Sequence, residues 1–145
     1  MPAIPLTPGE VDSLCQRAAQ AAQHSYSPYS HFRVGAAILL HADEKQSGVV
    51  VAGTNVENAS YRLTSCAEQA AIASAITQYG PQVRIRAVAV ANLNGAACMP
   101  CGACRQTILE FAGAETAVFY PGADGEIVST TLAELLPAGF RLLPQ

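Results

Sequence analysis

The chain has 145 residues, half of them apolar and only 13% charged, with a formal net charge of −3. This length predicts one domain, residues 1–145, because domains usually contain about 100–200 residues. Eight residues are lysine or arginine, which is too few for a phosphate-neutralising surface and excludes a nucleic-acid partner. Ordinary soluble domains have about 25% charged residues. The lower fraction in this chain indicates that part of its surface is covered by other subunits of a homo-oligomer.

The first half of the chain predicts a helix followed by a hairpin. Residues 7–10 have the pattern of a capping box, and apolar positions then recur at helical spacing to about His24. The apolar run from Phe32 to Leu40 predicts a buried strand. A polar turn over 43–48 and a second strand over 48–53 complete an antiparallel hairpin.

The second half alternates helices and strands. An alanine-rich helix over 66–79 should be capped by Thr64 or Ser65 and stopped by Gly80-Pro81. The later elements are a strand over 85–91, a helix over 101–112, strands over 116–120 and 126–130, and a short helix starting at Thr131. This order predicts a mixed five-stranded sheet sandwiched between helices, a three-layer α/β/α fold.

Three cysteines predict a metal site with one ligand missing. Cys101 and Cys104 are separated by two residues, Cys66 lies about 35 residues earlier, and Glu68 is the nearest acid. Structural zinc is closed by four protein ligands, whereas catalytic zinc keeps its fourth position for water. The two cysteine segments begin predicted helices, whose N-termini carry about half a positive charge and favour thiolates. A catalytic zinc site with Glu68 as its acid/base follows.

The chain has five cysteines, and the other two need an interpretation. Cys15 is predicted to be a small core residue of the first helix. Cys98 could close the zinc site as a fourth ligand and make it structural. An odd number of cysteines does not suit a simple disulfide framework, and reduced thiols indicate the cytoplasm. The N-terminus shows no signal peptide, and the apolar runs are far below the roughly 20 residues of a membrane span.

These motifs resemble the cytidine deaminase family in its homotetrameric, three-cysteine form. Cys66-Ala67-Glu68 and Pro100-Cys101-Gly102-Ala103-Cys104 match a zinc deaminase signature in which cysteine replaces the usual histidine. Further similarity covers 26–37, 55–61 and 135–140. The resemblance implies the three-layer fold, one Zn²⁺ per subunit, a homotetramer, and hydrolytic deamination of cytidine and 2′-deoxycytidine in pyrimidine salvage.

The resemblance also assigns roles around the substrate. The three cysteines bind zinc, and Glu68 exchanges protons with the reactants. Phe32 packs against the pyrimidine ring, and Asn55 and Glu57 bind the ribose 3′-hydroxyl. Apart from the resemblance, the main-chain groups of Ser65, Ala67 or Cys98 are candidates to hold the pyrimidine edge, and Ala67 is included among the predicted substrate-binding residues. From the residues alone, Phe32 would be a core aromatic, and Asn55 and Glu57 would be turn residues.

Four further residues carry predictions from the resemblance. Tyr61 and Phe140, core aromatics by default, match residues that lie near an active site across a subunit boundary. Family members commonly have arginine where this chain has Gln69, which can donate a hydrogen bond but adds no charge. We hypothesise that the helix N-termini, helped by Arg105, compensate the charge of the thiolates.

Three other functions use part of this pattern. A deaminase of a modified cytosine nucleoside such as blasticidin S would share the zinc motif. The segment 55–58, in which Asn55 and Glu57 match ribose-binding residues and Asn58 is interpreted as structural, favours an ordinary ribose. A thiol–disulfide oxidoreductase would use Cys101 and Cys104 and leave Cys66 and Glu68 unexplained. A zinc-stabilised binding domain would need a fourth ligand, which only Cys98 or a histidine (His24, His31 or His41) could supply.

Overall fold

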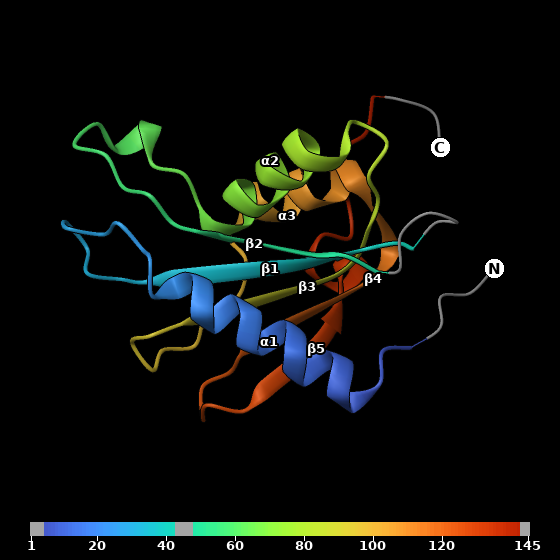
Figure 1. Cartoon of the computed structure of the whole chain (residues 1–145), viewed down its shortest axis with the longest axis horizontal. Coiled ribbons are helices and arrows are strands. Elements are labelled where there is room, and N and C mark those ends of the chain that lie inside the picture. Colours follow the sequence, from blue (N-terminus) through green and yellow to red (C-terminus); the bar gives the residue numbers. More distant parts are fainter. Residues whose placement is uncertain (1–4, 43–47, 143–145) are drawn as a thin grey trace.

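A five-stranded sheet lies between two layers of helices in the computed structural model, which describes residues 5–42 and 48–142 (Figure 1). The elements in chain order are α1 (Pro8–Ala22), β1 (Val34–Leu40), β2 (Val50–Thr54), the 3₁₀ helix η1 (Tyr61–Leu63), α2 (Ala67–Tyr79), β3 (Ile85–Asn92), α3 (Gly102–Phe111), β4 (Ala112–Pro121), β5 (Ile127–Thr131) and α4 (Leu132–Leu135).

The sheet is mixed, with the strand order β2-β1-β3-β4-β5. β1 runs antiparallel to both β2 and β3, and β4 runs antiparallel to β5. β3 and β4 are parallel, so α3 serves as the crossover between them. The fully apolar strand β1 lies inside the sheet and is buried along its whole length, as expected for a strand that is covered on both faces.

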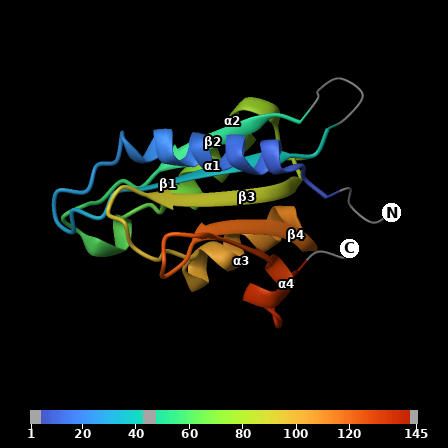
Figure 2. The same ribbon diagram turned by 90° about the horizontal axis from the view of Figure 1, so that it is seen from below.

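The two faces of the sheet carry separate apolar clusters. On one face Leu14 and Ala18 of α1 pack against Ala37, Leu39 and Phe119. On the other face α2, α3 and α4 cover the larger cluster, which includes Ile72, Ile108 and Leu132. Figure 1 shows α1 on the side opposite α2 and α3. In Figure 2, α1 crosses in front of β1 and leaves β4 uncovered.

Gly53 lets α2 approach the sheet closely. A Cβ atom built on this β2 residue would lie 2.8 Å from the carbonyl oxygen of Ala67 and would also clash with the backbone nitrogen of Ala71. Only glycine leaves room for such backbone contact. The first turn of α2 is therefore set directly on β2.

The structure confirms the order of helices and strands and differs at several boundaries. β1 begins at Val34 instead of Phe32, because the side chain of Asn55 bonds this entry segment. Cys66 is the N-cap of α2, so the prediction of Thr64 or Ser65 is wrong. Ser65 instead pairs with Val56 in an isolated bridge.

Other boundaries differ by a few residues at the ends. α1 ends at Ala22 instead of His24. β4 starts at Ala112, directly after α3, and the predicted start at Thr116 is too late. The 3₁₀ helix η1 was not predicted. Residues 43–47 of the predicted hairpin turn lie outside the described residues. In the described ranges no helix has the length and apolar character to cross a membrane.

Candidate metal centre and active site

The three predicted metal ligands meet where α2 and α3 begin. The sulfur atoms of Cys66, Cys101 and Cys104 all lie within 4.8 Å of one another. Cys66 and Cys101 are the N-caps of α2 and α3, and Cys104 lies in the first turn of α3. The expected convergence of two helix N-termini is thus confirmed. Helix N-termini carry a partial positive charge, which suits the binding of a negatively charged ligand set at this point.

This group of sulfur atoms fits a zinc ion. Zn–S bonds of about 2.3 Å in a tetrahedral site place sulfur atoms roughly 3.8 Å apart, which is compatible with the observed cluster. Within residues 5–42 and 48–142, no further histidine, cysteine or acidic side chain joins the cluster. Cys98 instead packs against the larger core cluster, and burial raises the pKa of its thiol to about 11. The donor set is therefore that of an open zinc site, not a closed structural one.

The thiols of the cluster influence one another's ionisation. The hydrogen bond with Cys104 lowers the pKa of the Cys66 thiol to about 7. The same bond, together with burial, raises the pKa of Cys104. Cys66 is therefore the thiol of this pair that ionises first.

Glu68 is buried beside the sulfur atoms, in the first turn of α2. Its residue is 4% exposed, and burial raises the pKa of its carboxyl group, opposed by hydrogen bonds with its own backbone and with Cys104. An acid in this position can exchange a proton with a molecule held at the metal.

Gln69 and Arg105 bond the backbone around the ligands. The amide of Cys66 donates to Oε1 of Gln69 (3.1 Å), which completes a capping box at the start of α2. Arg105 donates to the carbonyl oxygens of Pro100 (2.8 Å) and Leu135 (2.9 Å) and to the sulfur of Met99 (2.8 Å). Both side chains therefore hold the segments that present cysteines, and an effect of either on thiolate charge stays a prediction.

The predicted ribose residues lie in a loop that connects two parts of the site. Val56 pairs through its backbone with Tyr26 on one side and with Ser65 on the other. Ser65 directly precedes the ligand Cys66, and Tyr26 begins the segment that leads to Phe32. The loop thereby links the predicted base-packing residue to the metal centre.

Glu57 lies in this loop and bonds the segment before Phe32. Its carboxylate accepts hydrogen bonds from the amides of Tyr29 (3.0 Å) and Ser30 (3.2 Å) and from the Ser30 hydroxyl. The hydroxyl bond, followed by those amide bonds, lowers the pKa of the Glu57 carboxyl group. The ionised form of Glu57 is therefore favoured, and part of the hydrogen-bonding capacity of its carboxylate is already used by Tyr29 and Ser30.

The two predicted intersubunit aromatics are on the surface. Tyr61 is 85% exposed and Phe140 is 64% exposed, so the interpretation of either as a core residue is wrong. Gln106 of α3 clamps Phe140 by accepting from its amide (3.2 Å) and donating to its carbonyl (2.7 Å). Sequence reasoning missed Gln106, since only its position two residues after Cys104 connects it with the site.

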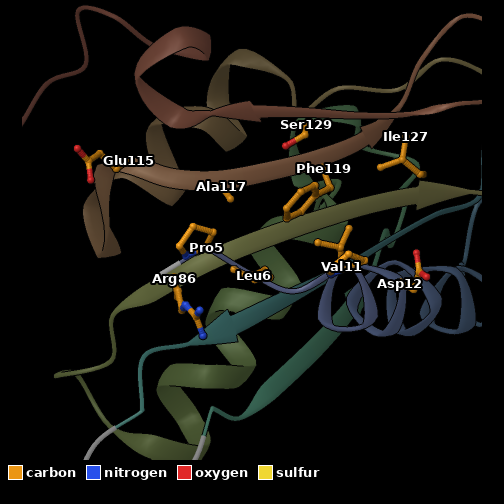
Figure 3. A pocket seen from close by; sticks show the side chains of 11 residues that line it. Pro5, Leu6, Val11, Asp12, Arg86, Glu115, Ala117, Phe119, Ile127 and Ser129 are labelled. Atoms are coloured by element: carbon orange, nitrogen blue, oxygen red, sulfur yellow. The ribbon is translucent and has the colours of Figure 1, made fainter. Parts of the chain in front are cut away.

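A cavity on the other face of the sheet lies apart from the predicted site residues. It has a volume of about 570 Å³ and lies between α1 and the β4–β5 strands, with Val11, Phe119 and Ile127 among its lining residues (Figure 3). None of the predicted site residues lines it. We assign it no part in chemistry at the cysteines.

The mixed sheet and the three-cysteine cluster define a zinc-binding α/β protein, and comparisons with known proteins identify its family. The model of the cytidine and deoxycytidylate deaminase zinc-binding region matches residues 9–120. The cytidine deaminase of Halalkalibacterium halodurans is 42% identical over 127 residues, which cover 88% of this chain and 91% of that protein. The cytidine deaminase of Mycobacterium tuberculosis is 42% identical over 125 residues, with 86% and 85% covered.

Solved structures agree. The crystal structure of the Mycobacterium tuberculosis cytidine deaminase superposes with a TM-score of 0.77 at 41% identity and covers 92% of this chain and 98% of that one. The Burkholderia pseudomallei cytidine deaminase gives a TM-score of 0.76 at 36% identity, with 93% and 100% covered. The chain belongs to the cytidine and deoxycytidylate deaminase family.

Proposed function

We propose that this protein hydrolyses cytidine and 2′-deoxycytidine to uridine and 2′-deoxyuridine with release of ammonia. The observation that carries the proposal is the buried carboxyl group of Glu68 beside three sulfur atoms that lie within 4.8 Å of one another. Relatives named as cytidine deaminases, at about 40% identity over most of the chain, support the same reaction.

Cys66, Cys101 and Cys104 would hold the metal, and Glu68 would move the protons. When bound, Zn²⁺ supplies the Lewis-acid chemistry that makes a water nucleophilic near pH 7. Glu68 takes a proton from the attacking water and delivers it to N3 of the pyrimidine. It then carries the second proton from the new hydroxyl group to the amino nitrogen, so that ammonia leaves as C4 becomes a carbonyl.

The side chains of Phe32, Asn55 and Glu57 would hold the nucleoside. The ring of Phe32 offers a flat apolar face to the pyrimidine. The carboxylate of Glu57 can accept a hydrogen bond from the ribose 3′-hydroxyl, while the side-chain amide of Asn55 donates one to the oxygen of the same hydroxyl. Ala67 is buried between Cys66 and Glu68, and we propose that its main chain holds the pyrimidine edge.

We also propose that the active protein is a homotetramer with shared active sites. The high exposure of Tyr61 and Phe140 supports an arrangement in which these aromatics reach the active site of a neighbouring subunit. Reduced zinc-binding thiols suit the cytoplasm, where the reaction would serve pyrimidine salvage.

The test is to incubate zinc-loaded protein separately with cytidine, 2′-deoxycytidine and blasticidin S and to measure deaminated product and ammonia. We expect uridine and ammonia in equal amounts, loss of activity on removal of zinc, and recovery on its return. Conversion of blasticidin S alone would replace the proposed substrate by a modified cytosine nucleoside. No ammonia from an assembled, zinc-loaded sample would contradict deamination altogether.

A further inference from the structure

The amide side chain of Asn55 is bonded to the chain on both sides of Phe32. Its Oδ1 accepts from the backbone amide of Val34 (3.1 Å) and from the hydroxyl of Ser25 (2.5 Å), and its Nδ2 donates to the carbonyl oxygen of Phe32 (2.8 Å). Asn55 is 9% exposed. The backbone amide of Val34 can only donate and the carbonyl of Phe32 can only accept, so the orientation of the side-chain amide is fixed by its partners.

These bonds occupy most of what a side-chain amide can offer. The oxygen of asparagine accepts about two hydrogen bonds, and its NH₂ group donates two. Both acceptor positions and one N–H of Asn55 are engaged within the chain. A single N–H is left for a ribose hydroxyl, so the greater part of this side chain serves the protein itself.

Asn55 bonds the chain at the point where Phe32 leaves the sheet. The β1–β2 ladder ends at the pair Gly35 and Thr54, and the side chain of Asn55 continues it toward Phe32. On the other side of Phe32, His31 has a φ of 61°, a left-handed conformation that non-glycine residues rarely adopt. A backbone that turns this way needs external bonds to stay in place. Asn55 supplies those on the Val34 side.

We propose that Asn55 is a positioning residue for Phe32, in addition to any contact it makes with the ribose. By holding the carbonyl of Phe32 and the amide of Val34, it sets the direction in which the Phe32 ring meets the pyrimidine. The proposal rests on the proposed deamination, because Phe32 matters there as the residue that orients the base. It differs from a ribose-binding role in predicting an effect that does not need the 3′-hydroxyl.

The decisive variant is Asn55→Asp, which keeps the acceptor for Ser25 and Val34 and replaces the donor to Phe32 by an oxygen that repels its carbonyl. We expect kcat/KM for cytidine to fall about a hundredfold, since a misplacement of about 1 Å can cost that factor. With 3′-deoxycytidine, which cannot make the proposed ribose contact of Asn55, the variant should still fall well below the wild type. Equal kcat/KM values for the two proteins on 3′-deoxycytidine would overturn the proposal.

A double-mutant cycle separates positioning from general damage. In a Phe32→Ala background, Asn55→Asp should cause no further loss on 3′-deoxycytidine, because the ring it positions is gone. A full additional loss would contradict the proposal, since a merely weakened fold would lower activity in both backgrounds. The matched control is Asn58→Asp, the same change in the same loop, where the side-chain oxygen accepts from the Ser60 amide. It should leave both substrates unaffected.

Two further measurements test the proposal if Asn55→Asp does not fold. Ser25→Ala removes one partner of Asn55 without altering Asn55 or Phe32, and should lower kcat/KM roughly fivefold on both substrates, as expected for one lost hydrogen bond. Hydrogen exchange tests the contact without turnover: the Val34 amide should exchange at least roughly fivefold faster in Asn55→Ala. Unchanged exchange would overturn the proposal, whereas a wild type inactive on both nucleosides would contradict only the deamination.

Discussion

The side chain of Gln69 shows how one residue serves a metal ligand through the backbone. It accepts from the amide of Cys66 and so caps α2 at the residue that carries a zinc-binding sulfur. The side chain of Gln69 is neutral and is engaged by the backbone, so it adds no charge beside the thiols. We infer that Gln69 acts chiefly by orienting Cys66.

Loss of this cap should weaken zinc retention. Gln69→Ala removes the acceptor, and a lost N-terminal cap costs about 1 kcal/mol, which corresponds to roughly fivefold faster zinc release. Gln69→Glu keeps an oxygen that can accept from the Cys66 amide, so it serves as the control variant in which the cap is retained. The measurement is the rate of zinc transfer to a chelator. Equal release from Gln69→Ala and the wild type would show that the cap does not hold the ligand.

Glu57 should contribute to stability in a pH-dependent manner. Hydrogen bonds from Ser30 and Tyr29 lower the pKa of its carboxyl group in the folded protein. A lowered pKa stabilises the fold above the unfolded value of about 4.3, and this contribution is lost as the pH falls through the folded value. Glu57→Gln should therefore lower the melting temperature at pH 7, and the difference from wild type should shrink at acid pH. A difference that is independent of pH would contradict this.

At the scale of elements, the site depends on how closely α2 lies on β2. Gly53 has no Cβ, and the backbone of Ala67 occupies the space that a Cβ would need. Ala67 lies between Cys66 and Glu68, the proposed catalytic acid, so a shift of this turn moves both. The close approach of helix and sheet is thus part of the metal centre.

Gly53→Ala should destabilise the protein by about 1–3 kcal/mol, the usual cost of overpacking, and should also speed zinc release. Gly113→Ala is the matched control, because a Cβ at that position meets nothing within 4 Å. Both variants would be compared by denaturant unfolding and by chelator transfer. If Gly53→Ala retained zinc as well as Gly113→Ala does, α2 would have more room than the structure gives it.

Local patterns in the sequence predicted the elements and the metal ligands well. Apolar periodicity, alanine content and helix stop signals are short-range features that predict where a helix lies. They place Cys66 and Cys101 at the starts of two helices. The contacts of Asn55 with Phe32 and of Gln106 with Phe140 join residues 23 and 34 positions apart. No local signal encodes such pairings, because they arise only when the sheet and α3 are assembled. The N-cap of α2 lies at Cys66, one residue after the predicted range, because Ser65 pairs with Val56 of the preceding loop.

At the scale of the whole molecule, the exposed aromatics predict dependence on a neighbour. Phe140 has its backbone clamped to α3 while its side chain remains 64% exposed. A fixed backbone with an exposed ring suits insertion into another subunit. This arrangement supports the proposed shared active site.

Complementation between subunits tests that sharing. Phe140→Ala should lower kcat/KM by up to about tenfold, the scale of one aromatic contact, and Glu68→Gln should nearly abolish turnover. Tetramers assembled from both variants should exceed the average of the two, because some sites combine an intact Glu68 with an intact Phe140 from the neighbour. Strict averaging of the two activities, or an active monomer by light scattering, would contradict shared sites.

The most direct test of the account compares wild type and Glu68→Gln at equal zinc content. The measurement is the ultraviolet absorbance change as cytidine becomes uridine, with bound zinc determined in the same samples. We expect the wild type to convert cytidine and the variant to keep its zinc while turning over at least about a hundredfold more slowly, as loss of a general acid/base predicts. Near-normal turnover by the zinc-loaded variant would contradict the assignment of proton transfer to Glu68.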